Sequence, residues 1–113
     1  MIRVHLHYPT RKGEAKEFPS THDAATWVWL EEKEAIAVLF HVDGDGEMLR
    51  LQDWFEKAAA DRAQAAQLGS LDGRFEVWTN TVIAADAGGG WRLVYRRAIA
   101  AVQSLGPTIR FKE

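Results

Sequence analysis

The first residues of the chain alternate between apolar and polar side chains, from Ile2 to Tyr8. Alternation with a period of two is typical of a strand that has one buried and one solvated face. Pro9 ends this strand, and a turn around Gly13 leads to a short polar segment over residues 14–18. The pattern therefore predicts that an antiparallel hairpin opens the fold.

Helical spacing of apolar residues follows the hairpin. Ser20, with Asp23 three residues later, is typical of a helix N-cap, and the apolar positions after it predict a helix over residues 21–33. A second apolar stripe, rich in alanine in its second half, predicts a longer helix over residues 47–68. Gly69 stands where a helix commonly ends.

Two further segments have the character of strands. Residues 35–42 are apolar on both faces and end at a glycine-containing turn over residues 43–46. This pattern predicts a central strand that is covered on both sides. Residues 74–83 alternate and are rich in β-branched and aromatic side chains, which predicts another strand.

The C-terminal part carries two competing periodicities. After a glycine-rich loop over residues 84–90, residues 91–95 alternate like a strand, whereas residues 94–105 keep an apolar stripe at helical spacing. We favour a helix over residues 93–104. A short edge strand over residues 108–112 is expected to follow it.

These elements give the order ββαβαβαβ. A chain of 113 residues that is 47% hydrophobic and 27% charged has the size and composition of one globular domain. No internal repeat or linker interrupts it. We therefore predict a single α+β domain over residues 1–113, with a mixed four- to five-stranded sheet and two or three packed helices.

Charge and cysteine content narrow the function classes. The net charge of -2 gives no global attraction to nucleic acid or to an anionic membrane, so such binding would need a local patch. The chain contains no cysteine, which excludes disulfides, thiolate catalysis and cysteine-ligated metal sites. Its apolar runs are far shorter than the roughly 20 residues that span a bilayer. We expect a cytoplasmic protein that does not associate with membranes.

Histidines offer one candidate for metal chemistry. His5 and His7 lie on the same face of the first predicted strand, about 6.5 to 7 Å apart. His41, with Asp43 and Asp45, could complete a ligand shell if the first and central strands are neighbours. The pair itself lacks a defined third ligand, so solvated histidines are the favoured interpretation. We expect no metal and no other cofactor.

Catalytic motifs are absent from the sequence. No serine lies in a nucleophile elbow. Glu31, Glu32 and Glu34, at or after the end of the first helix, are expected in solvent. We therefore assign no catalytic residue and favour a protein that is not an enzyme.

Binding surfaces have stronger candidates. At 100° per residue, Trp29 points away from the stripe that contains Trp27, so either Trp29 is exposed or the first helix is covered on two sides. Exposed tryptophans are common anchors of interfaces. Trp78 shares a strand face with polar Glu76 and Asn80, and is a second candidate.

Arginines near the C-terminus form a basic region. Residues 74–113 carry six Lys/Arg against three Asp/Glu, and the candidate contacts are Arg92, Arg96 and Arg97. The main hypothesis is a small module that binds a partner protein, as an inhibitor, an immunity protein or an accessory protein. The alternative is nucleic-acid binding through these arginines, and a metal-dependent enzyme built on the histidines comes third.

Overall fold

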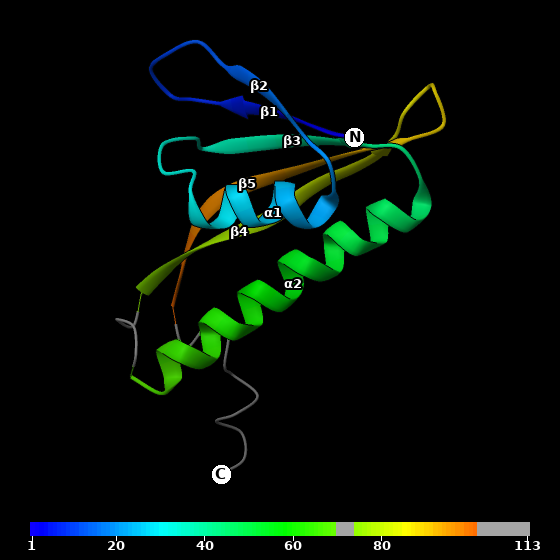
Figure 1. Ribbon diagram of the computed structural model, residues 1–113. Helices are drawn as coiled ribbons and strands as arrows, with labels where there is room; N and C mark the ends of the chain where they lie inside the picture. Colours follow the sequence, from blue (N-terminus) through cyan, green and yellow to red (C-terminus); the bar gives the residue numbers. More distant parts are fainter. Residues whose placement is uncertain (70–73, 102–113) are drawn as a thin grey trace.

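A computed structural model describes residues 1–69 and 74–101, which form a five-stranded antiparallel sheet and two helices (Figure 1). The strands are β1 (Ile2–His7), β2 (Glu14–Phe18), β3 (Ala37–Val42), β4 (Arg74–Ala85) and β5 (Trp91–Ala101). The helices are α1 (Thr21–Leu30) and α2 (Asp45–Gln67). The predicted α+β fold class is confirmed.

The strands are ordered β2-β1-β3-β5-β4, and every neighbouring pair is antiparallel. β3 lies at the centre, as its apolar sequence predicts. The expectation of a mixed sheet is wrong for the described residues, because it depended on a helical crossover before the last strand. β4 and β5 instead form a hairpin, and antiparallel strands need only a short turn.

The predicted helix over residues 93–104 is wrong as far as the structure describes it, because residues 91–101 form β5. Leu93 and Tyr95 belong to the alternating pattern, and they are 0% and 2% exposed. The alternation, and not the helical spacing of apolar residues, therefore matches the structure of this segment. Gly89, with φ +95°, allows the tight turn that precedes β5. The described order is ββαβαββ, and the expected strand over residues 108–112 lies outside the described residues.

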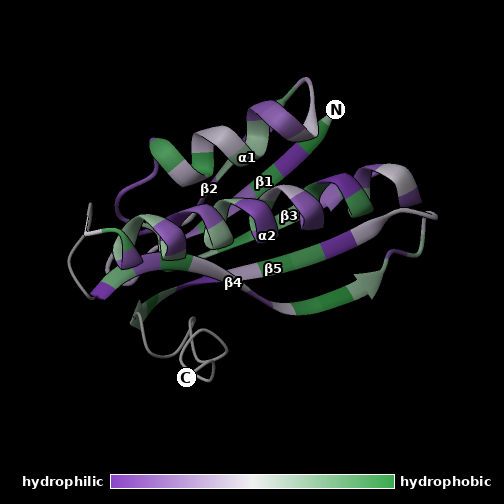
Figure 2. Cartoon of the chain, turned by 90° about the horizontal axis from the view of Figure 1, so that it is seen from below, coloured by the Kyte–Doolittle hydropathy of each residue, from purple (hydrophilic) through white to green (hydrophobic). Residues whose placement is uncertain are grey.

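Both helices cover the same face of the sheet, as the two perpendicular views show (Figures 1 and 2). The alternation in β1 follows from this arrangement, because Ile2, Val4 and Leu6 are buried toward the helices and the residues between them are exposed. The expectation that β3 is covered on both sides is wrong. Leu39 and His41 are only partly buried, since they point away from the helices.

Helix α1 begins where the sequence predicts it, and α2 begins at Asp45, two residues before the predicted start at residue 47. The Ser20 hydroxyl accepts a hydrogen bond from the backbone N–H of Asp23 at 3.1 Å, which confirms the predicted N-cap. Asp45, at the start of α2, accepts a bond of 2.7 Å from the indole N–H of Trp91, which joins this helix to β5. Among the described helices, none is both long and apolar enough to cross a membrane.

Candidate binding surface

The sheet face opposite the helices is covered by no described segment, and it is termed the open face. Its side chains are identified by strand alternation and by direct pairing across the sheet. They include Arg3, His5, His7, Ala15, Glu17, Ala37, Leu39, His41, Thr79, Val82, Ala84, Arg92, Val94 and Arg96. The register places them in three rows that run across the strands.

The central row crosses all five strands. Its members are Ala15, His5, Leu39, Val94 and Val82, each paired directly with the next. All but His5 are apolar, and Val82 is 50% exposed. An apolar stripe therefore runs across a surface that the described part of the chain leaves open to solvent.

Arginines flank this stripe on both sides. One neighbouring row holds Glu17, Arg3, His41 and Arg92, and the other holds His7, Ala37 and Arg96. The structure thus brings Arg92 and Arg96 to one surface, as proposed from the sequence, but it does so on a strand rather than on a helix. Residues four apart on a strand share a face, about 13 Å from each other.

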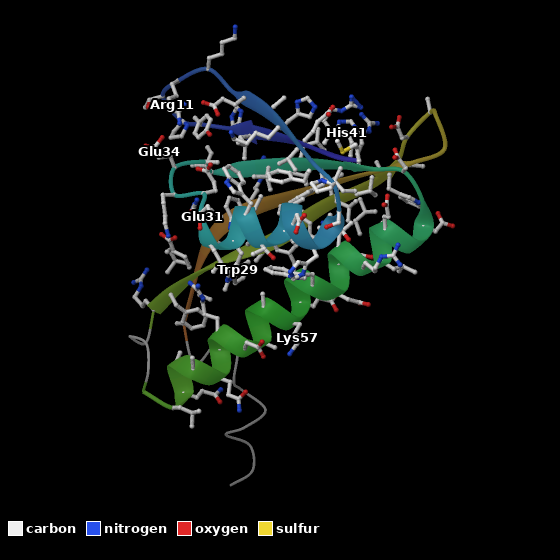
Figure 3. All side chains as sticks on the ribbon, viewed as in Figure 1. Arg11, Trp29, Glu31, Glu34, His41 and Lys57 are labelled. Carbon is white, nitrogen blue, oxygen red and sulfur yellow. The ribbon has the colours of Figure 1, made fainter. Side chains whose placement is uncertain are left out.

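His41 is partly buried on this face. Its Nδ1 has no hydrogen-bond partner among the described residues and lies 3.9 Å from an Asp86 carboxylate oxygen. Burial, followed by the neighbouring His5 and Arg3, lowers the pKa of His41, and Asp86 only partly opposes them. Figure 3 shows His41 on the side of the sheet opposite Trp29 and Lys57.

The proposed metal constellation assembles only in part. His5 and His7 share the open face, and the rings of His5 and His41 meet edge to face with centroids 5.2 Å apart. Asp45 bonds the indole of Trp91 instead of joining them. Within residues 1–69 and 74–101, no group of three or more His, Asp or Glu side chains is arranged to hold a metal ion.

A hollow lies within the open face, over β1, β3 and β5. It is open to solvent and has a volume of about 540 Å³, and the side chains around it include His5, His7, Leu39, Val94 and Arg96. The small side chains of Ala37 and Ala15 leave room between these larger neighbours. The periodicity of apolar residues in the sequence could not predict this hollow, because the hollow depends on the pairing of strands that are distant in the chain.

Trp29 is not a free surface anchor. It is half-buried, and its ring meets Trp54 at 6.0 Å and Phe55 at 5.8 Å between α1 and α2. The Arg62 guanidinium lies over the ring at 5.3 Å. Helix α1 is therefore covered on two sides, by the sheet and by α2, which is the second of the two arrangements that the sequence allowed.

Trp27, expected to face the core, is also only half-buried and packs against Phe18 of β2 with ring centroids 5.6 Å apart.

Trp78 and Arg97 contact other residues of the domain instead of forming a binding surface. Trp78 is 5% exposed, so the structure gives it no surface for a partner. Arg97 lies over its ring at 4.6 Å and donates to the carbonyl oxygens of Ala35 at 2.9 Å and Glu32 at 3.2 Å. An ion pair of 2.9 Å to Glu76 completes its contacts. Long-range contacts of this kind cannot be read from a cluster of basic residues.

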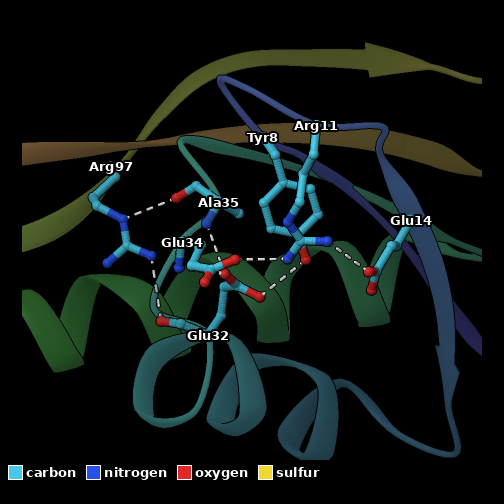
Figure 4. Close-up of polar contacts among 7 residues, drawn as sticks. All are labelled: Tyr8, Arg11, Glu14, Glu32, Glu34, Ala35 and Arg97. Atoms are coloured by element: carbon cyan, nitrogen blue, oxygen red, sulfur yellow. Dashed lines mark hydrogen bonds and ion pairs between the residues drawn. The ribbon is translucent and has the colours of Figure 1, made fainter.

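The expectation that the glutamates after α1 are solvated is wrong for Glu32 (Figure 4). Glu32 is 7% exposed, and one carboxylate oxygen accepts the backbone N–H groups of Glu34 and Ala35, each at 2.6 Å. The other oxygen accepts the Tyr8 hydroxyl at 3.4 Å. This carboxylate holds the turn between α1 and β3, whereas Glu31 is exposed.

Comparisons of the chain with protein-family models, with curated protein sequences and with solved structures found no match. No similarity to a known protein therefore assigns a role to the open face, and its own chemistry indicates what it can bind.

Proposed function

We propose that this chain is an intracellular, non-enzymatic module that binds a partner protein through the open face. The observation that carries the proposal is the central row, a mainly apolar stripe that crosses five strands on the side of the sheet opposite the two described helices. An apolar centre with a polar rim is the usual anatomy of a protein interface. An inhibitor, an immunity protein or an accessory protein would act through such a surface.

The dimensions of the open face suit a compact partner element. Four strand spacings of about 4.8 Å make the face about 19 Å wide. An α-helix with its side chains is about 10 to 12 Å across, so one helix or one hairpin fits on the face. Trp29 and Trp78 do not belong to this surface, because both pack on the helix side of the sheet. Of the arginines named from the sequence, Arg92 and Arg96 remain as binding residues.

Nucleic-acid binding is the alternative, and it is favoured by the arginines that the structure gathers on one face. Single-stranded nucleic acid is usually held by aromatic side chains on which the bases stack. Among the described residues, the open face contains no Phe, Tyr or Trp, and its centre is mainly aliphatic. This composition supports a protein partner over nucleic acid.

Two substitutions of similar exposure separate the open face from the helix face. Val82 on the open face is 50% exposed and Leu49 on α2 is 54% exposed, so glutamate at either position leaves the core intact. We expect the chain to capture a partner from lysate of its own organism after nuclease treatment. Val82→Glu should abolish the capture and Leu49→Glu should not. Equal capture by both variants, or loss of all capture with nuclease, would contradict the proposal.

A further inference from the structure

The hollow in the open face combines the guanidinium of Arg96 and the imidazole of His7 with an apolar floor. Ala37 pairs with His7 on one side and with Arg96 on the other. Two strand spacings separate His7 from Arg96, which places their Cα atoms about 10 Å apart. Because Ala37 is small, the space between the two longer side chains stays open, within a hollow of about 540 Å³.

Arg96 is available to bind a ligand, unlike Arg11 and Arg97. Arg11 is paired with Glu14 and Glu34, and Arg97 is paired with Glu76. Within the described residues, the side chain of Arg96 makes no ion pair and is exposed. A guanidinium group recognises a carboxylate through two parallel hydrogen bonds.

The carboxylate nearest the hollow is engaged in an ion pair. Glu14 lines the edge of the hollow, and its carboxylate bonds Arg11 at 2.9 Å, while Arg11 also bonds Glu34 at 2.7 Å. The floor is formed by Leu39 and Val94, which can cover the methylene groups of a ligand and exclude water. Exclusion of water strengthens the attraction between a carboxylate and the guanidinium of Arg96.

We propose that this hollow binds a carboxylate side chain of the partner protein, between His7 and Arg96, so that the partner docks with an acidic segment. The proposal rests on the proposed function and adds the chemistry of the partner. Glutamate suits the site best, because its two methylene groups match the apolar floor and its carboxylate reaches the guanidinium. A phosphate group has no apolar part that would cover Leu39 and Val94.

An NMR titration of the full chain tests this site directly, with a capped oligoglutamate peptide as the probe and oligoglutamine as the uncharged control. We expect oligoglutamate to shift the amide signals of Ala37, Leu39 and Arg96 in a saturable way. Arg96→Gln should weaken this binding by about fivefold, the upper end of the effect of losing one exposed charged contact. Arg50→Gln, the same change at an exposed position on α2, should leave the affinity within about twofold.

Two results would overturn the carboxylate site: equal weakening by Arg96→Gln and Arg50→Gln, and tighter binding of oligothymidylate at the same ionic strength. Equal affinity for free succinate would overturn the assignment to a side chain of a partner protein, because the hollow would then bind a small dicarboxylate. Failure of the carboxylate site can be distinguished from failure of the proposed function. If capture of the partner depends on Val82 but not on Arg96, the open face remains the binding surface and only the carboxylate site is wrong.

Discussion

Replacing Glu32 by alanine should destabilise the fold more than any other single change to the glutamates after α1. The substitution removes the acceptor for two backbone N–H groups, those of Glu34 and Ala35. Ala35 is 0% exposed, so water cannot replace the lost carboxylate at its N–H. The turn that leads from α1 into the central strand would then contain unsatisfied donors.

The size of the effect follows from these bonds. A buried donor left without a partner costs about 1 to 3 kcal/mol. Two such donors, one of them only partly buried, give an expected loss of about 2 to 4 kcal/mol in the free energy of unfolding. The bond from Tyr8 is long, at 3.4 Å, and adds little. Glu32→Gln keeps an acceptor oxygen and should lose about half as much.

Urea denaturation followed by circular dichroism measures this loss, with Glu31→Ala as the matched control. Glu31 is an exposed glutamate directly before Glu32, so its replacement should change the free energy of unfolding by no more than about 0.5 kcal/mol. If Glu32→Ala and Glu31→Ala unfold at the same urea concentration with the same slope, the carboxylate does not hold the turn and the reasoning is refuted.

Three further predictions concern residues on both sides of the sheet. Arg97→Ala should lower the free energy of unfolding by about 2 to 3 kcal/mol, because two carbonyl oxygens lose their donor, whereas exposed Arg96→Ala should change it by no more than about 0.5 kcal/mol. Trp29→Ala should cost about 2 kcal/mol, less than a fully buried tryptophan, and an unchanged melting temperature would show that its aromatic contacts are not stabilising. The pKa of His41 is lowered in the fold, so the unfolded chain binds the proton more readily and stability should fall as the pH drops below the ordinary value of 6.5. His41→Leu should make this fall smaller. Urea denaturation at several pH values measures the free energy of unfolding, and an equal dependence on pH in the variant and the original chain would contradict the prediction.

Local patterns in the sequence predicted most of the fold. The alternation of β1, the N-cap at Ser20 and the apolar run of β3 each depend on neighbouring residues, and each matches the structure. Residues 93–101 were mispredicted because alanines there mimic a helical stripe, while pairing with β4 imposes the strand. That pairing is a contact between two segments, and the periodicity of apolar residues within one segment cannot predict it.

The binding surface was predicted only in fragments. Arg92 and Arg96 were recognised as basic residues, but the rows that unite them with β1 and β3 depend on the register of the sheet. Arg97 looks identical in sequence, and only its contacts across the fold show that it is structural. The hollow over Ala37 follows from small side chains on adjacent strands, so no single segment of the sequence could indicate it.

Site-specific photo-cross-linking tests the role of the open face most directly. A photoreactive residue is placed at His5, in the central row, or at Lys57, on the exposed side of α2, and the chain is irradiated in the cells that produce it. We predict that the His5 position forms a cross-link to a partner protein and that the Lys57 position does not. Cross-links from Lys57 alone would place the binding surface on the helices and contradict the account.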